Sequence, residues 1–311
     1  MIKKAFKGQI GFLISIIIGL CIIVTLINPR FVSPQNITNL FKQVSVTGIC
    51  ALASAIVLIG GGFDLSVGTL LSLVACVIAS LINLGVPEFL AILCGILVGT
   101  LGGALNGIVI AKTGCAPVII TLGSMGLFKG AALMIARGNI INFKKPICFL
   151  GATQTFGIPT IVLIFLAMAI FVYILLNKTV FGRRIYAIGG NGEAAYLSGV
   201  DITKSTVLIY ATDGFIVSFA AIALLMRLGS ASAVMGDSYT LDAVASAVIG
   251  GVAITGGKGT VPGCFLGILL LGVISNAMNL LGVTAYLQEM VLGLIVIVAA
   301  SISMFGVKKR K

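Results

Sequence analysis

Long apolar runs separated by short polar segments cover almost the whole chain. Read with a window of about 19 residues, these runs predict membrane-spanning helices along the full sequence. The predicted spans are 10–27, 43–60, 68–85, 89–111, 117–136, 159–177, 206–226, 243–257, 263–281 and 286–305. We therefore expect an all-α, polytopic membrane protein with about ten transmembrane helices, forming a single transmembrane domain over residues 1–311.

The predicted connections between spans are short, and only 29–42, 137–158 and 178–205 are longer. They leave no room for a soluble domain such as a fused ATPase. The first apolar run is longer than the core of a signal peptide and lacks a small-residue cleavage site, so we expect a retained span. An even number of spans places both termini on one side, and the distribution of lysine and arginine predicts that this side is the cytoplasm.

Composition supports a lipid-embedded chain. Hydrophobic residues make up 59% of the sequence and charged residues only 9%. The 20 basic residues exceed the 8 acidic ones, but they lie between apolar runs, so membrane topology explains them better than nucleic-acid binding does. The chain has no histidine, and its seven cysteines form no CxxC pair. We therefore expect no catalytic residues, metal or cofactor, and we interpret the cysteines as small hydrophobic residues.

Glycine is the second compositional signal, with 40 residues. Many recur at every fourth position, a spacing that allows helix backbones to approach closely. These glycines are Gly95, Gly99, Gly103 and Gly107, then Gly259, Gly263 and Gly267, and the pair Gly126 and Gly130. For each glycine alone, tight packing is the simpler interpretation.

Two other glycine clusters, 60–68 and 250–259, interrupt apolar runs with polar and charged residues, and we expect broken helices there. Similar sequences precede the two clusters, ASAI at 53–56 and ASAV at 245–248, which suggests an internal repeat. Glycine-interrupted segments at corresponding places in two halves of a transporter indicate a substrate path.

Asp64 lies in the first cluster, at the edge of the hydrocarbon region, where a carboxylate needs water, a partner or free backbone N–H groups. Two interpretations stay open: Asp64 caps the following helix, or it takes part in transport. Asp213, isolated in an apolar run, poses the same question.

The longest polar cytoplasmic segment is 178–205. It contains a match to the dinucleotide fingerprint at 190–195 after the strand-like Ile185–Ile188, but the segment is too short for the βαβ unit that such a site needs. The GGKGT run at 256–260 likewise lacks the spacing of a phosphate-binding loop. The segment exceeds what joining two helices requires, and we expect a short surface helix and a protein-docking site rather than a plain connector.

Five stretches carry a family resemblance. They are GGGFDLSVGTLLSL (60–73), GALNGIVIAKTGCAPVIITLGSM (103–125), FGRRIYAIGGNGEAAYLSGV (181–200), YTLDAVASAVIGGVAITGGKGTVPG (239–263) and NAMNLLGVTAYLQ (276–288). In this order they closely resemble the ribose-type permease subunits of bacterial sugar ABC importers, and the resemblance covers nearly the whole chain.

The resemblance implies a multi-pass subunit of the bacterial inner membrane that uses alternating access and is not itself an enzyme. Its implied partners are a second permease copy, as a homo- or heterodimer, a cytoplasmic ABC ATPase and an extracytoplasmic sugar-binding protein. It also implies an ATPase-coupling loop, with candidate residues Gly182, Arg183, Arg184, Gly189, Gly190, Asn191, Ala194 and Gly199. Candidates for the translocation path or for helix breaks are Gly61, Asp64, Ser66, Asn106, Thr121, Gly256 and Gly257.

The resemblance leaves the transported solute open. Relatives often carry an aromatic residue after the proline that opens the fifth span, whereas this chain has Val118 after Pro117. Ribose or a related monosaccharide is the expected cargo, with a nucleoside or an autoinducer-type furanone as alternatives. A secondary transporter coupled to an ion through Asp64 and Asp213 is a rival class. An intramembrane enzyme has little support, because no paired carboxylates on one helix and no metal-ligand cluster are present.

Overall fold

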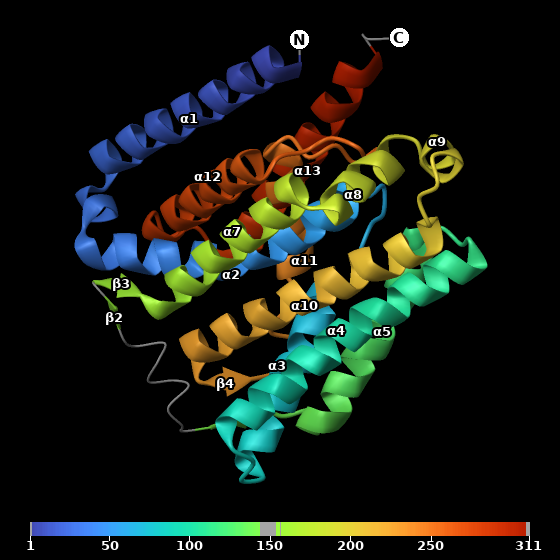
Figure 1. The fold of residues 1–311 in the computed structure, drawn as a ribbon. Helices are drawn as coiled ribbons and strands as arrows, with labels where there is room; N and C mark the ends of the chain where they lie inside the picture. Colours follow the sequence, from blue (N-terminus) through green and yellow to red (C-terminus); the bar gives the residue numbers. More distant parts are fainter. Residues whose placement is uncertain (1, 144–153, 156, 309–311) are drawn as a thin grey trace.

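The computed structural model describes residues 2–143, 154–155 and 157–308. Cys148, Lys144 and Lys145, together with the last three residues, lie outside this part of the chain. Most of the described residues are helical, and seven of the described helices are long and apolar enough to cross a membrane. The chain is therefore an all-α polytopic membrane protein, as its sequence predicts (Figure 1).

The seven long helices form most of the bundle. They are α1 (Ile2–Ile27), α2 (Pro34–Ile59), α4 (Glu88–Thr113), α5 (Pro117–Ala136), α7 (Thr160–Lys178), α10 (Ile202–Leu228) and α12 (Val261–Leu280). The other helices are η1 (Pro29–Val32), α3 (Val67–Asn83), α8 (Val180–Gly190), α9 (Gly192–Leu197), α11 (Tyr239–Ile249) and α13 (Ala285–Lys308). Two short antiparallel ribbons pair β1 (Ile141–Asn142) with β4 (Ser230–Ala231) and β2 (Gln154–Thr155) with β3 (Ile158–Pro159).

The bundle has two distinguishable ends. α8 and α9, the beginning of α10 and the link between α4 and α5 lie together, and we name this the α9 end (Figure 1, upper right). Both ribbons, η1 and the link between α3 and α4 lie at the opposite side, which we name the ribbon end. A hydrogen bond from Asn83 Nδ2 to the Asn142 carbonyl (3.0 Å) ties the end of α3 to the first ribbon there.

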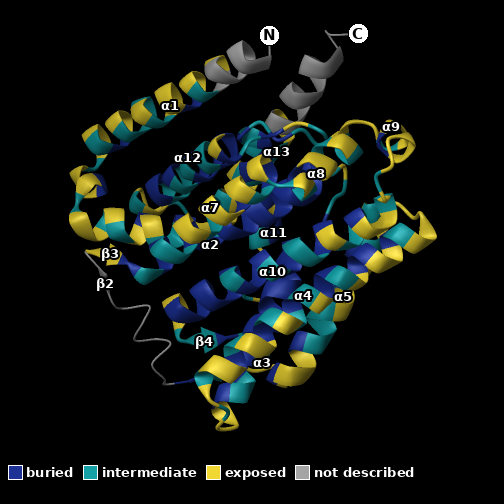
Figure 2. Ribbon diagram, viewed as in Figure 1, coloured by how far each residue is buried: buried dark blue, intermediate teal, exposed yellow. Residues whose placement is uncertain are grey.

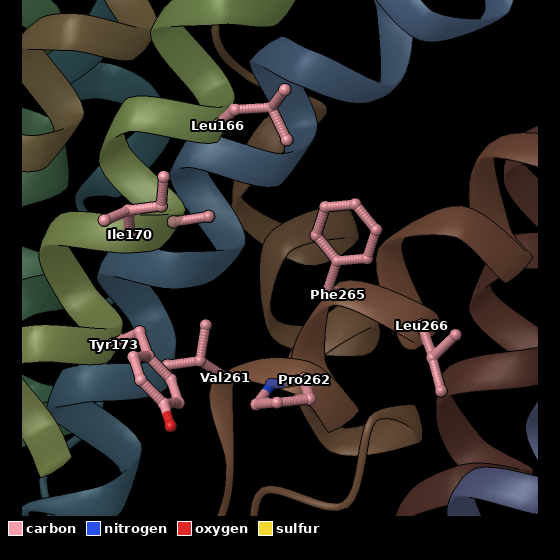
Figure 3. A pocket seen from close by; sticks show the side chains of 8 residues that line it. Leu166, Ile170, Tyr173, Val261, Pro262, Phe265 and Leu266 are labelled. Atoms are coloured by element: carbon pink, nitrogen blue, oxygen red, sulfur yellow. The ribbon is translucent and has the colours of Figure 1, made fainter.

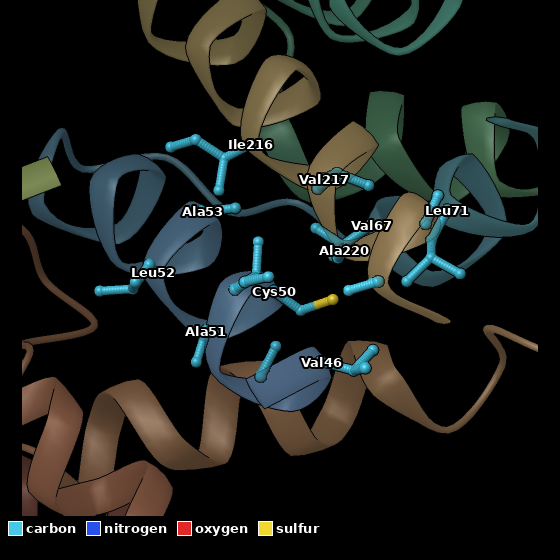
Figure 4. Packing of buried hydrophobic residues seen from close by; sticks show 14 of the residues in the cluster. Val46, Cys50, Ala51, Leu52, Ala53, Val67, Leu71, Ile216, Val217 and Ala220 are labelled. Carbon is cyan, nitrogen blue, oxygen red and sulfur yellow. The ribbon is translucent and has the colours of Figure 1, made fainter. Parts of the chain in front are cut away.

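α2 and α10 form the centre of the fold. Fifteen of the sixteen residues of α2 from Val44 to Ile59 are buried, all but residue 47, and α10 is buried along most of its second half. Around Cys50, apolar side chains of α2 meet Val67 and Leu71 of α3 and Val217 of α10 (Figure 4). Peripheral helices such as α1 and α5 leave most of their surface exposed (Figure 2), as expected for surfaces that face lipid or another chain.

The glycine row of α4 packs against α10. A Cβ on Gly103 would collide with the Tyr210 carbonyl oxygen, and one on Gly99 would lie 2.8 Å from the Gly214 carbonyl oxygen. In the same way, Gly263 and Gly267 of α12 press against the backbone of α11. The predicted close packing is confirmed at these places, but it is wrong for Gly126 and Gly130, which face open space.

Three local predictions are corrected. The span 243–257 is not one helix: α11 ends at Ile249, and Gly251, Gly256 and Gly257 then adopt left-handed backbone (φ 90°, 84° and 69°). The connection 29–42 is shorter than expected, because Ser33 accepts a hydrogen bond from the Asn36 N–H (3.3 Å) and so begins α2 early. The strand-like Ile185–Ile188 is helical within α8.

α2 and α11 end in the same way. After α2, the N–H groups of residues 60, 61 and 62 donate to the carbonyls of residues 56, 58 and 57. After α11, those of residues 250, 251 and 252 donate to residues 246, 248 and 247. The second residue of each turn is a glycine with positive φ, Gly61 (80°) and Gly251 (90°). The same turn, with a glycine of positive φ at its second residue, also follows α3, α9 and α12, so it is a common helix ending in this chain. The similar ASAI and ASAV sequences are two residues out of step with the turns after α2 and α11.

Candidate functional site

Two helices that are too short to span a bilayer begin at the same place inside the bundle. α3 has 17 residues and α11 has 11, whereas a span needs about 20. The Gly68 N–H in the first turn of α3 donates to Thr240 Oγ1 of α11 (3.0 Å), and the Gly236 N–H before α11 donates to Ser72 Oγ of α3 (2.9 Å). A side-chain oxygen of each helix thus accepts a hydrogen bond from a backbone N–H group at the start of the other helix.

The segment 60–66 runs from the end of α2 back to the start of α3 and carries a buried polar chain. Asp64 Oδ1 accepts hydrogen bonds from the Ser66 N–H and the Ser66 hydroxyl, both at 2.6 Å. Ser66 Oγ accepts from Asn106 Nδ2 of α4 (3.0 Å), and Asn106 Oδ1 accepts from the Ser124 hydroxyl of α5. Ser66 occupies the N-cap position of α3, so Asp64 is not the cap residue but accepts the N–H of the cap.

Further polar groups hold the same segment. The Tyr210 hydroxyl of α10 donates to the Phe63 carbonyl (3.2 Å), and the Thr121 hydroxyl of α5 lies 3.4 Å from the same carbonyl. Asp213 of α10 lies one helical turn after Tyr210, whose hydroxyl bonds the residue next to Asp64, so the two buried carboxyls are close enough to influence each other. We name Asp64, Ser66, Asn106, Ser124 and Asp213 the polar cluster; its members are at most 9% exposed.

The structure thus brings together four of the predicted path residues, Asp64, Ser66, Asn106 and Thr121. Sequence reasoning raised Asp213 only as an open question beside Asp64 and did not consider Tyr210 or Ser124. A signal existed for two of these three residues, because Tyr210 and Asp213 are three residues apart and so share one helix face. Ser124 carries no comparable pattern, and only the packing of α5 against the cluster identifies it.

The other three predicted path residues, Gly61, Gly256 and Gly257, lie elsewhere, against α8. The Gly257 N–H donates to the Ile59 carbonyl at the end of α2 (2.8 Å). A Cβ on Gly61 would lie 3.3 Å from the Gly189 Cα, and one on Gly257 would lie 2.6 Å from the Gly190 Cα. The turns that follow α2 and α11 therefore meet each other and the end of α8, with backbone against backbone.

α8 and α9 are built by local caps. Thr179 Oγ1 accepts from the Gly182 N–H (3.0 Å) at the start of α8, and Asn191 Oδ1 accepts from the Ala194 N–H (3.0 Å) at the start of α9. Gly199 follows α9 with a positive φ of 82°, which redirects the chain towards α10. The Tyr186 hydroxyl donates to the Gly259 carbonyl (2.9 Å), so α8 is also fastened to the 250–260 loop.

The outer surface of α8 and α9 is exposed and mixed in character. Arg183, Arg184 and Gly190 are exposed, and α9 presents Tyr196 and Leu197 with 69% and 79% of their surface accessible. An exposed aromatic and leucine beside two arginines are typical of a protein-docking surface.

The charged residues at the start of α10 interact with an arginine of the exposed α8–α9 surface. The Lys204 backbone N–H bonded to Asp201 (2.9 Å), aided by the charges of Lys204 and Arg184, holds the pKa of the Asp201 carboxyl below its ordinary value. Burial raises the pKa of Tyr186 on α8. Asp201 is thus an ionised cap of α10 beside the exposed arginines.

A separate groove lies between α7 and α12 (Figure 3). Leu166, Ile170 and Tyr173 of α7 face Val261 and Phe265 of α12 across it. Its lining is apolar and offers a polar solute no hydrogen-bond partners, so the polar cluster and the α8–α9 surface are the better candidate sites.

Comparison with known proteins identifies the class. A family model for the permease component of the branched-chain amino acid transport system matches residues 36–300. The chain is 39% identical over 289 residues to the ribose import permease protein RbsC of Bacillus subtilis (strain 168), covering 90% of this chain and 88% of that protein. It is 35% identical over 301 residues to RbsC of Escherichia coli (strain K12), covering 95% and 94%. It is 36% identical over 274 residues to the D-allose transport system permease protein AlsC of the same strain, covering 88% and 84%.

An all-helical bundle with broken helices and a buried polar cluster defines a polytopic transport protein. The chain belongs to the family of transport-system permease components, and within it to the ribose-type permeases.

Proposed function

We propose that this chain is the membrane-spanning permease subunit of an ATP-driven importer for ribose or a related monosaccharide. Family membership and relatives named for ribose and D-allose support this proposal. ATP hydrolysis belongs to a separate cytoplasmic ABC ATPase, and an extracytoplasmic binding protein delivers the sugar. The chain acts as one transmembrane domain in a bacterial inner membrane, paired with a second permease copy.

We infer ten crossings of the membrane, which the arrangement of the helices supports. The segment 60–66 with α3 completes one crossing, and the segment 229–238 with α11 completes another in the opposite direction. Together with α1, α2, α4, α5, α7, α10, α12 and α13 they make ten, so both termini lie in the cytoplasm with the α9 end.

The observation that carries the coupling proposal is the contact of α8 with both glycine turns. Gly189 packs against Gly61 and Gly256, and Gly190 packs against Gly257. An ATPase that grips the exposed face of α8 and α9 therefore acts directly on the turn that begins one broken crossing, at Gly61, and on the turn that ends the other, after α11. A displacement of α8 changes the positions of α3 and α11, whose first turns are hydrogen-bonded to each other.

The polar cluster lies beside the pathway in this proposal. Thr121 and Ser124 join α5 to the cluster, yet α5 leaves most of its surface exposed. We infer that the exposed face of α5 borders the passage, which the second permease copy closes on the other side. The cluster then holds the wall of the passage in shape rather than binding the sugar directly.

Reconstituted complexes test the coupling. Gly190→Ala adds a methyl group that meets no atom of this chain within 4 Å, and Arg184→Ala removes an exposed side chain. We expect both variants to enter the membrane and unfold like the wild type but to lose sugar-stimulated ATP hydrolysis and uptake. Normal hydrolysis and uptake in both variants would show that α8 does not carry the coupling.

Gly189→Ala is the matched comparison, because its Cβ would collide with the Ile59 carbonyl oxygen inside the chain. That variant should lose stability as well as uptake.

The class of transporter is tested separately, with vesicles that contain the permease alone. Sugar accumulation driven by an ion gradient without the ATPase would support a secondary transporter and contradict the proposed function.

A further inference from the structure

The polar cluster holds two buried carboxyl groups that influence each other, and no described lysine or arginine pairs with either. Asp64 is 3% exposed and Asp213 is fully buried. Asp64 Oδ2 and both oxygens of Asp213 have no hydrogen-bond donor from the described residues. Two ionised carboxylates close together in a buried site repel each other strongly, and each also loses its hydration.

No neighbouring group relieves this repulsion. The ionisable groups that interact with the pair are Tyr210 on α10 and Cys50 on α2, and both are neutral acids in their ordinary form. α4 and α5 contribute the amide of Asn106 and the hydroxyl of Ser124. No lysine or arginine in the described part of the chain interacts with either carboxyl. Arg184 faces Asp201 instead, about 18 Å further along α10 at 1.5 Å per residue.

The donors are distributed unequally between the two carboxyls. Every donor in the chain of hydrogen bonds points towards Asp64: Ser124 donates to Asn106, Asn106 to Ser66, and Ser66 to Asp64. The Ser66 backbone N–H adds a second bond to the same oxygen. These donors stabilise Asp64 in its ionised form, because a carboxylate that accepts several hydrogen bonds retains its charge. Asp213 accepts none from the described residues.

We propose that a proton bound on Asp213 is a structural ligand of this permease: the Asp213 carboxylic acid donates it to Oδ2 of Asp64 and so fastens the segment 60–66 to α10. This arrangement satisfies Asp64 Oδ2 and removes the repulsion with one proton. The inference concerns the chain itself and does not depend on which sugar is carried.

Loss of the proton has a defined structural consequence. The two carboxylates then repel, which weakens the attachment of the segment 60–66 to α10 and leaves the bond from the Tyr210 hydroxyl to the Phe63 carbonyl to hold it there. The same segment contains Gly61, which packs against α8. Deprotonation therefore loosens the connection between the polar cluster and the α8–α9 surface.

The first test is the pH dependence of unfolding of the purified full-length protein in detergent. Circular dichroism is the suitable signal, because the chain has no tryptophan. The range from about pH 5 to pH 9 lies above the ordinary titration of an aspartate near 3.9. Since the folded state holds a proton that the unfolded state releases, we expect the folding equilibrium constant to fall by up to about tenfold per pH unit within this range.

Asp213→Asn separates this effect from other titrations. The asparagine amide donates to Asp64 without needing a proton, so we expect this variant to fold and to lose the pH-dependent step. Asp237→Asn is the control, because Asp237 pairs with Lys129 at a partly exposed site (2.7 Å), and we expect it to keep the step. An unchanged step in Asp213→Asn would overturn the proposal. If that variant fails to fold, a wild-type folding equilibrium that does not change between about pH 5 and pH 9 would likewise overturn the proposal.

Infrared difference spectroscopy gives an independent readout. A protonated aspartic acid has a carbonyl stretching band that carboxylates lack and that shifts in D₂O. We expect the band in the wild type and in Asp237→Asn at neutral pH, and its loss in Asp213→Asn.

A third measurement exchanges sodium for potassium or choline at constant pH and ionic strength. Stabilisation by sodium would identify a metal cation between the carboxyls and overturn the proton assignment.

Discussion

Gly68 and Gly236 lie backbone against backbone where the two short helices α3 and α11 begin. A Cβ on either residue would collide with the carbonyl oxygen of the other. The contact is reinforced on both sides by the hydrogen bonds that the Gly68 and Gly236 N–H groups donate to Thr240 Oγ1 and Ser72 Oγ. α3 and α11 are therefore joined at their starts, although about 170 residues separate them along the chain, and movement of one displaces the other.

Gly236→Ala should separate these two starts. The added methyl group meets backbone rather than a flexible side chain, so we expect a loss of about 1–3 kcal/mol in the free energy of unfolding. Detergent-titration unfolding measures the change. Gly126→Ala is the matched control, because its Cβ meets nothing within 4 Å, and equal losses in both variants would contradict the proposed contact.

Thr240→Val tests the hydrogen bond across the same contact. Valine keeps the shape of threonine but removes the oxygen that accepts the Gly68 N–H, which leaves a buried donor unpaired. We expect a cost of about 1–3 kcal/mol in stability. Thr240→Ser retains the hydroxyl and should lose much less. Equal losses of stability in Thr240→Ser and Thr240→Val would contradict a stabilising role for the hydrogen bond to Thr240 Oγ1.

Ser124→Ala tests the polar cluster from its α5 side. It removes the hydroxyl that donates to Asn106 Oδ1, leaving a buried acceptor unsatisfied, so we expect a loss of about 1–3 kcal/mol in unfolding free energy. Ser198→Ala removes an exposed hydroxyl after α9 and should change stability by less than about 0.5 kcal/mol. An effect of Ser124→Ala no larger than that of Ser198→Ala would show that the cluster contributes little to stability.

Tyr186→Phe tests the attachment of α8 to the 250–260 loop. It removes only the hydroxyl that donates to the Gly259 carbonyl, so we expect a loss of about 0.5–1.5 kcal/mol in unfolding free energy. Because the bond joins α8 to this loop, sugar uptake per ATP hydrolysed should also fall in the reconstituted complex. Unchanged stability and unchanged uptake per ATP would contradict this role of Tyr186.

Asp201→Asn tests the ionised cap of α10. The lowered pKa means that ionised Asp201 stabilises the folded state above the ordinary titration range of an aspartate, and that this contribution is lost as the pH falls through the lowered pKa. Asparagine keeps a cap oxygen but no charge. We therefore expect the variant to be less stable than the wild type at neutral pH and to lose less stability on acidification, as measured by circular dichroism. Parallel acid profiles would exclude the charge effect.

The exposed groups of α8 and α9 illustrate what local patterns predict well. The mixed charge and length of 178–205 predicted a surface helix there, and α9 begins at Gly192, within the expected region. α8 was not predicted as a helix, because Ile185–Ile188 has a strand-like composition and its helix depends on the Thr179 cap and on packing against the glycine turns. Tertiary contacts thus outweigh the local preference.

The membrane class, the positions of the long helices and the places where two helices break could all be predicted from the amino-acid pattern alone. These follow from hydropathy and from glycine, which act locally along the chain. Tertiary packing alone brings Asp64 close to Asp213 and Gly68 against Gly236, and it places Gly61, Gly256 and Gly257 on α8 rather than in the polar cluster. Such contacts join residues far apart in the chain. They depend on how closely whole helices pack, and no single segment of sequence contains that information.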